Sequence, residues 1–384
     1  MNSRINFVAA AFTLTALSYG LARFAYGLLL PQIREDLSVS VTAAGWIGGS
    51  AFGAYCLGII LALLGSGKFN PRTIALLAGF AATTGMLLVA LAASGWMLGA
   101  GIALAGLGTG LTSPPLASAV SHQFCNANRP KANAIINAGT ALGIVFSGMT
   151  AWMAAGAWRE IYFGFALMGA GVTLWLWFTF PRNVDALRPG NFSWVILKRP
   201  GFLTLCVSAF LMGLSSTAIW TFGADILRAK AGFSDAHIAW IWVTLGIFGI
   251  AGALTGILTE RFGIRMIHTL SLSGMALATA GLEMASVSVI YGFIAVGIYG
   301  AAYIISSGVY LIQGTELLAD RPDLGLGIPF LAVAAGQAVG NPLFGAVMAS
   351  AGVVYAPGIF AAAACIAIFI RPAAPFTERQ VKGY

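Results

Sequence analysis

Charged residues are scarce in this chain of 384 residues, in which Lys and Arg number 20 and Asp and Glu 12. They make up 8% of the sequence, whereas a soluble domain carries about 25%. Hydrophobic residues make up 59%, and the mean hydropathy is +0.88. These values exclude a soluble protein. A signal peptide followed by a soluble domain is also excluded, because apolar segments recur as far as the C-terminus.

Motifs for catalysis, redox chemistry and metal binding are missing as well. The four cysteines lie far apart with no CxxC pair, and the three histidines lack the grouping of a metal site. There is no Walker sequence for nucleotide phosphates, and no Ser, His and Asp set converges in sequence. An intramembrane enzyme would need paired catalytic groups at one depth, and a channel would need rings of repeated polar residues. We see neither pattern, and we expect no enzyme, no cofactor and no metal.

The apolar runs predict an all-α membrane protein with twelve transmembrane helices. Each run provides the roughly 20 apolar residues that cross a bilayer and is bounded by charges, Pro or Gly. The first six begin near Ile5, Val41, Arg72, Trp96, Ala132 and Arg159. The second six begin near Gly201, Ala236, Ile264, Val287, Leu326 and Val353.

The basic residues predict which way the chain crosses the membrane. Of the 20 Lys and Arg, fifteen fall on the side that holds both termini, four fall on the other side, and Arg23 is the remaining one. The positive-inside rule therefore predicts that both termini are cytoplasmic. No basic patch interleaved with aromatic residues exists, so we expect membrane lipid as a partner and no nucleic acid.

The chain divides into two halves of similar sequence. One long polar segment separates residues 1–181 from residues 201–384, and we expect residues 182–200 to be a cytoplasmic linker. At an offset of 194, Arg34 matches Arg228, Ser40 matches Ser234, Trp46 matches Trp240 and Gly106 matches Gly300. Single matches are weak evidence, but a nearly constant register through several spans indicates duplication. We therefore predict two six-helix bundles.

The segment Gly256–Arg265, GILTERFGIR, resembles the loop signature Gly-x-x-x-acidic-Arg-x-Gly-x-basic of the major facilitator superfamily. The stretches Arg23–Pro31 and Gly139–Gly148 resemble the YbfB-like bacterial branch of that family. The resemblance implies the major facilitator fold and a location in the bacterial inner membrane. It also implies alternating access, in which the two bundles rock about a central site lined chiefly by the first, fourth, seventh and tenth helices.

The same resemblance implies roles for single residues. In the family, the acidic residue of the loop signature helps to hold the cytoplasmic side closed, so we expect Glu260, Arg261 and Arg265 to act in gating. The matching loop of the first half departs from the signature, with Gly67 in place of the acidic residue. Ile102 stands near the position of an arginine that proton-coupled members often carry, which weakens the case for coupling by that route.

Arg23 lies within the apolar stretch Phe7–Pro31, which contains no counter-ion. An arginine near the centre of a membrane helix costs roughly 3 kcal/mol on insertion scales and about 10 or more in simulations. Arg23 precedes Arg34 by eleven residues, which places it roughly 16 Å from the outer boundary. The guanidinium fork suits carboxylate, phosphate and similar anions. An internal ion pair is the alternative, but the nearest carboxylates, Asp225 and Glu283, fall near outer helix ends.

Further residues are candidates to line the same site. Tyr19 and Tyr26 fall within about 60° of the Arg23 helix face at 100° per residue. Tyr299 and Tyr303 begin a polar-aromatic stripe on the tenth span, which lines a cavity or packs against neighbouring helices. The other candidates, each with helix packing as an equally strong alternative, are Thr112, Asn137, Trp220, Gln337 and Asn341.

These observations favour a secondary transporter, a monomer that moves a small, anionic solute across the inner membrane. Transport of the anion would move net charge across the membrane unless a proton or a counter-anion accompanies it. The alternative is an efflux carrier for amphipathic or aromatic compounds, in which the aromatic residues recognise the solute and Arg23 is structural. Normal substrate affinity after loss of the Arg23 charge would favour the alternative.

Overall fold

The computed structural model describes residues 3–65, 69–125, 128–154, 156–181, 196, 198–318 and 322–370. Most of the predicted linker, residues 182–195, lies outside the described residues, as does the Gly67 position. The described chain is almost entirely helical, which confirms the all-α prediction.

The first half begins with one continuous helix made of α1 (Ser3–Thr15), η1 (Ala16–Phe24) and α2 (Ala25–Leu37). It continues with α3 (Val41–Gly65), α4 (Pro71–Ala90), α5 (Gly95–Gln123), α6 (Arg129–Met153) and α7 (Trp158–Thr179). The second half comprises α8 (Phe202–Trp220), α9 (Gly223–Ala231), α10 (Asp235–Gly249), η3 (Ile250–Leu254), α11 (Thr255–Phe262), α12 (Ile264–Gly281), η4 (Leu282–Ser286), α13 (Val289–Leu317), α14 (Pro322–Ala351) and α15 (Tyr355–Phe369).

Ten helices of the described chain are long and apolar enough to cross a membrane. The other two predicted spans correspond to α12, which contains Arg265 and His268, and to α15, which has only 15 residues. The structure therefore supports a multi-pass membrane protein, with ten of the twelve predicted spans meeting the length and composition of a membrane helix. The count of twelve stays a prediction.

The duplicated sequence corresponds to repeated helices. Helices α5 and α13 both contain 29 residues and begin 194 positions apart. Each is capped by a serine: Ser94 accepts a hydrogen bond from the Met97 amide, and Ser288 from the Ile290 amide. Side-chain caps satisfy amides that the helix itself leaves unpaired. The repeat thus extends from matched residues to matched helix starts.

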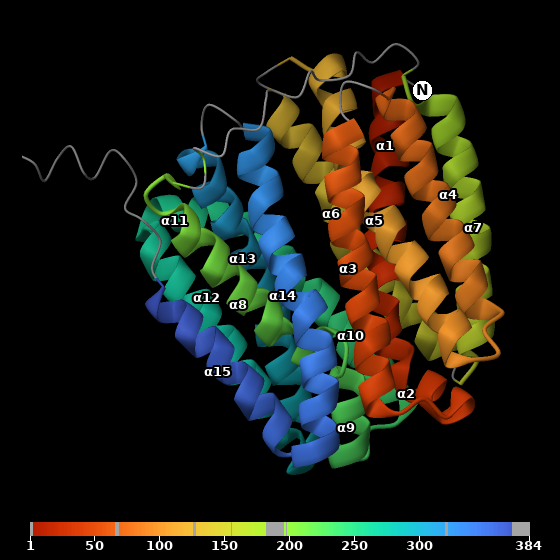
Figure 1. Ribbon diagram of the computed structural model, residues 1–384, viewed down its shortest axis with the longest axis vertical. Coiled ribbons are helices and arrows are strands. Elements are labelled where there is room, and N and C mark those ends of the chain that lie inside the picture. Colours follow the sequence, from red (N-terminus) through yellow and green to blue (C-terminus); the bar gives the residue numbers. More distant parts are fainter. Residues whose placement is uncertain are drawn as a thin grey trace, which may run out of the picture.

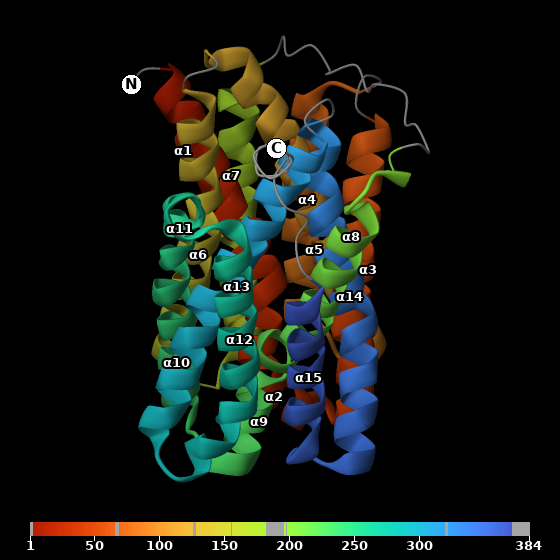
Figure 2. The same cartoon turned by 90° about the vertical axis from the view of Figure 1, so that its left-hand side faces the viewer.

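The two halves lie side by side (Figure 1), and the view turned by 90° shows the helices running roughly parallel to one long axis (Figure 2). The main contacts between the halves are α3 with α14 and α6 with α10. The repeat relates α3 to α10 and α6 to α14, so these two interfaces are equivalent. Two names are used for the ends of the molecule. The N-terminal end is the end at which α1 begins, and the Arg34 end is the end at which α2 contacts α9.

Gly27 in α2 permits the closest approach between the halves near the Arg34 end. A Cβ atom at this position would lie 1.9 Å from the carbonyl oxygen of Trp220 in α8. Backbone atoms cannot move aside as a flexible side chain can, so only glycine fits without a shift of one helix against the other. Gly53 in α3, by contrast, has no such neighbour within 4 Å.

We expect Gly27→Ala to force the halves apart near Trp220 and to lower stability by about 1–3 kcal/mol, the usual cost of overpacking. Gly53→Ala is the matched control and should leave stability nearly unchanged. The apparent melting temperatures of the purified variants in detergent measure both effects. Equal melting temperatures for the two variants would contradict the assigned contact.

Candidate functional site

Residues Ala16–Phe24 form a π-helical stretch inside the first long helix. Such wide turns are rare and frequently occur at functional sites. The Ser18 carbonyl accepts a 2.7 Å hydrogen bond from Thr109 of α5, a partner outside its own helix. A Cβ on Gly20 would lie 2.4 Å from the backbone of Gly143 in α6. The widened turn is thus packed closely against two neighbouring helices, and it carries Tyr19 and Arg23.

Aromatic rings surround the Arg23 guanidinium. Its central carbon lies 4.2 Å from the ring centroid of Tyr55 and 4.5 Å from that of Phe52, both on α3. The rings of Phe24 and Tyr19 lie at 5.0 and 5.8 Å. A cation over an aromatic ring gains about 2 kcal/mol or more when both are desolvated. The rings therefore offset part of the cost of placing this charge in the bilayer, without neutralising it.

The polar partner of Arg23 is uncharged. Nη2 donates a 2.8 Å hydrogen bond to Gln337 Oε1, and no Asp or Glu of the described chain forms an ion pair with Arg23. Nε is buried without a partner among the described residues, while the side chain as a whole is partly exposed. Arg23 thus keeps its positive charge and has donors to spare.

Gln337 connects Arg23 to the second half. It is fully buried in α14, and its Nε2 donates to Ser216 Oγ over 2.9 Å and to Tyr303 OH over 3.3 Å. Ser216 belongs to α8 and Tyr303 to α13, so one amide side chain joins the π-helical stretch of the first half to three helices of the second. The structure brings Arg23, Gln337 and Tyr303 together from positions that the sequence analysis selected separately.

Trp220 closes the space between the halves on the Arg34 side of Arg23. Its ring stacks on Phe24 with centroids 4.1 Å apart and meets the ring of Tyr303 edge-on at 5.1 Å. Tyr299 packs at 6.1 Å and donates to the Ser216 carbonyl over 3.0 Å. Trp220 is 2% exposed and Tyr299 is fully buried. Trp220 therefore belongs to a packed cluster of rings between the halves, and its role as a substrate contact stays a prediction.

Tyr19 and Tyr26 lie in different environments. The Tyr19 hydroxyl is hydrogen-bonded to Ser113 at 2.8 Å and to Tyr55 at 3.4 Å, beside Arg23. Tyr26 is buried and donates to the Ala44 carbonyl over 3.1 Å, away from the Arg23 group. The prediction of one shared face used 100° per residue, and a π-helical turn advances by a smaller angle. The shared face therefore includes Tyr19 and Arg23 but not Tyr26.

Two further candidates lie at contacts between helices. Thr112 Oγ1 lies 2.9 Å from Ser18 Oγ and fixes α5 to the π-helical stretch. Asn341 donates to the Gln337 carbonyl over 2.7 Å, and its Oδ1 would lie 2.8 Å from a Cβ placed on Gly48 of α3. Packing, the alternative given for both residues, accounts for the contacts that they make.

Asn137 is exposed on α6. It precedes Ala141 by one helical turn, and the Ala141 carbonyl would lie 3.2 Å from a Cβ on Gly246 of α10. Residues four apart share a helix face, so Asn137 lies on the face that α6 turns toward the second half. Asn137 itself lies one turn nearer the N-terminal end than the contact between Ala141 and Gly246.

The three predicted gating residues, Glu260, Arg261 and Arg265, are exposed. They belong to α11 and the first turn of α12, and α11 lies toward the N-terminal end (Figure 1). Arg261 lies 5.3 Å from the ring of its neighbour Phe262, and Glu260 forms no ion pair with any described residue. Their gating role stays a prediction.

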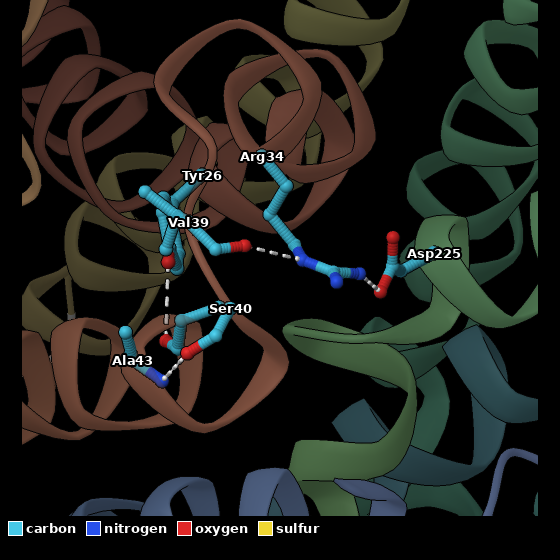
Figure 3. A network of polar contacts seen from close by, with 7 residues as sticks. Tyr26, Arg34, Val39, Ser40, Ala43 and Asp225 are labelled. Atoms are coloured by element: carbon cyan, nitrogen blue, oxygen red, sulfur yellow. Dashed lines mark hydrogen bonds and ion pairs between the residues drawn. The ribbon is translucent and has the colours of Figure 1, made fainter.

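The Arg34 end is joined by ion pairs between the halves. Figure 3 shows Arg34 reaching from α2 to Asp225 in α9, while its Nε donates to the Val39 carbonyl over 3.1 Å. Arg228, the repeat counterpart of Arg34, reaches back to Glu35 at 3.6 Å. The Asp225 side chain is only 9% exposed, and burial raises its pKa, which the charges of Arg34 and Arg228 oppose. Arg34 thus supplies the charge that favours ionised Asp225.

Sequence reasoning missed the rings of Phe24, Phe52 and Tyr55. Phe52 and Tyr55 are three residues apart on the second predicted span, so their spacing could have suggested a shared face. Aromatic residues at helical spacing are common in an apolar helix, and nothing in the sequence connects these two with Arg23.

Comparison with known proteins identifies the fold. The sequence model of a family described as Major Facilitator Superfamily matches residues 12–319. Among solved structures, the nucleoside transporter NupG (D323A mutant) superposes with a TM-score of 0.79 at 14% identity, covering 94% of this chain and 98% of that one. No curated protein matches at the level of sequence.

Two other solved structures are similarly close in fold. A bacterial homolog of the human lysosomal transporter Spinster, inward-facing and occupied, gives a TM-score of 0.78 at 17% identity over 96% of both chains. The peptide transporter POT in complex with sulfate gives 0.77 at 17% identity, covering 96% of this chain and 93% of that one. At such identities the likeness concerns the fold.

We expect Asp225→Asn to loosen the Arg34 end, because it removes a charge-assisted contact worth about 1.5–3 kcal/mol. A cysteine introduced at buried Ala224 should then react with an impermeant maleimide at least about tenfold faster. Asp36→Asn is the matched control, since Asp36 pairs with Arg159 inside the first half. Equal labelling rates in the two backgrounds would show that the pair between the halves does not hold this end closed.

Proposed function

Because the chain is a multi-pass membrane transporter that belongs to the major facilitator superfamily, we propose that it moves a small anionic solute by alternating access. The solute binds at Arg23 between the two halves. The transporter works as a monomer in the bacterial inner membrane, with both termini in the cytoplasm, as the distribution of basic residues favours.

The observation that carries this proposal is the state of Arg23. A cation near mid-membrane depth has a neutral hydrogen-bond acceptor and aromatic rings around it, and no acidic partner on the described chain. Keeping it there costs several kcal/mol, which an internal carboxylate would have reduced. A charge left uncompensated at such a cost is suited to a ligand of opposite sign.

The packing of the aromatic residues favours an anion over the alternative, an amphipathic or aromatic efflux substrate. Trp220 and Tyr55 are 2% and 3% exposed, and their faces are occupied by other side chains. A ring-shaped solute would first have to displace them. Arg23, Tyr19 and Ser113, which are partly exposed in this region, present polar groups.

Alternating access is supported by the difference between the two ends. At the Arg34 end, ion pairs and the Trp220 ring cluster join the halves. At the N-terminal end, Glu260 and its basic neighbours are exposed. This arrangement suits a state in which Arg23 is reached from the cytoplasm. In the opposite state Glu260 would contact the first half, and the Arg34 pair would be broken. Transport of the anion without movement of net charge would require an accompanying proton or counter-anion.

If Arg23 binds the anion, Arg23→Lys should keep the charge but lose the two-pronged fork, weakening binding by about 1–3 kcal/mol. Arg23→Gln should nearly abolish binding. We would measure thermal stabilisation of purified variants across a panel of organic and inorganic anions, together with their melting temperatures without ligand. Normal anion affinity in Arg23→Gln would refute the proposed function. A lower melting temperature with unchanged affinity would identify Arg23 as structural.

The gating role of Glu260 is tested separately. Glu260→Gln should preserve folding and anion binding but shift the balance between the two states, because it removes a charge-assisted contact of the closed cytoplasmic side. Cysteines introduced near each end report the balance through their labelling rates. Unchanged labelling at both ends would count against this role.

A further inference from the structure

The orientation of the Gln337 amide is fixed by its neighbours. Ser216 uses its own hydroxyl proton in a 2.6 Å hydrogen bond to the Gly213 carbonyl, so toward Gln337 it acts as an acceptor. Gln337 therefore points its Nε2 at Ser216, at 2.9 Å, and at Tyr303, at 3.3 Å. Its Oε1 is left to face Arg23 at 2.8 Å. The fully buried amide thus presents a planar carbonyl oxygen to the guanidinium.

This contact uses little of what Arg23 can donate. A guanidinium has five N–H groups, and a carboxylate can accept two of them side by side. The amide oxygen accepts from one N–H of Nη2, while the buried Nε has no partner among the described residues. The bond to Gln337 therefore reproduces one of the two hydrogen bonds of an Arg–carboxylate pair, without the negative charge of the carboxylate.

We propose that Gln337 is a placeholder for the substrate: its Oε1 occupies the position that one oxygen of a substrate monocarboxylate takes on Arg23. This inference rests on the proposed function, since it requires an anion at Arg23. Binding transfers Nη2 from Gln337 to the substrate, and the second carboxylate oxygen takes a further donor of the fork. No covalent bond forms or breaks in this exchange.

The charge available at the site sets the class of substrate. Arg23 is the one basic residue placed deep within the apolar spans of the sequence, with the others in loops or near helix ends. A second negative charge on the solute would be desolvated without compensation, which is costly. The fork also calls for two acceptor oxygens side by side, which a carboxylate supplies with a single negative charge and sulfate supplies only with two. A monocarboxylate meets both conditions.

The placeholder also links binding to motion. Arg23 lies in the first half and Gln337, Ser216 and Tyr303 in the second, so the Arg23–Gln337 bond ties the halves together at the level of the site. A substrate that takes Arg23 for itself releases that tie. Gln337 then keeps its bonds within the second half. The halves become free to shift once the site is filled.

Gln337→Glu tests the inference, because it supplies a tethered carboxylate to Arg23 in place of the neutral amide. We expect a melting temperature above that of the wild type, and at least a 100-fold loss of affinity for monocarboxylates. The probes are acetate, butyrate and benzoate, with sulfate and phosphate as tetrahedral comparisons. Gln337→Met, of similar volume but without an oxygen acceptor, should bind the monocarboxylates as well as the wild type or up to tenfold more tightly, since the competing oxygen is gone.

Gln313→Glu is the matched control, since it makes the same change in α13 ten residues beyond Tyr303, roughly 15 Å along the helix, at an amide whose Nε2 has no partner among the described residues. It should keep affinity within about threefold of the wild type. Size-exclusion profiles identify variants that fail to fold, and Gln337→Met decides the question if Gln337→Glu is among them.

Each of the other outcomes would overturn one defined part of the inference. Equal loss of affinity in Gln337→Met and Gln337→Glu would make Gln337 a direct ligand contact and end the placeholder role. Stabilisation of the wild type by sulfate or phosphate but by none of the monocarboxylates would overturn the substrate class, while leaving an anion site at Arg23. Unchanged affinity in Arg23→Gln would instead overturn the proposed function itself.

Discussion

The positive charge of Arg23, held among apolar helices with no acidic partner on the described part of the chain, is the constraint on which the centre of this protein depends. Rings of α3 lie over the guanidinium, and an amide of α14 accepts from it. Each of these contacts lowers the cost of burial, but none cancels the charge. A buried carboxylate would have given a more stable centre and left nothing for a solute to bind. The arrangement therefore exchanges stability for an available cation.

The two ends of the molecule handle charge in opposite ways. At the Arg34 end, opposite charges from the two halves meet, and Asp225 is largely removed from water. At the N-terminal end, Glu260 and Arg265 are exposed. Buried charge pairs between mobile parts are strong while intact and costly when only one partner remains. Such pairs are consistent with the alternating access that we propose, because they favour two discrete positions of the halves over a continuous range.

Much of the fold and part of the site could be predicted. Hydropathy and spacing gave the helices, and a constant offset gave the duplication, because both depend on local sequence patterns. Arg23 could be selected because a charge in an apolar stretch is costly wherever it points. Tyr303 and Gln337 were selected as helix-face residues and do lie beside it. Tyr26 does not, because packing against α5 and α6 accompanies a π-helical turn that an ideal helix lacks.

The sequence by itself determined a helical multi-pass membrane protein of two related halves with one cation deep inside. Only the tertiary structure decided what faces that cation. Arg23 and Gln337 are 314 residues apart in the chain, and Arg34 and Asp225 are 191 apart. Helical periodicity states which residues share a face, but the partner of that face depends on how the bundles pack. Packing is a property of many weak contacts acting together, and no single segment encodes it.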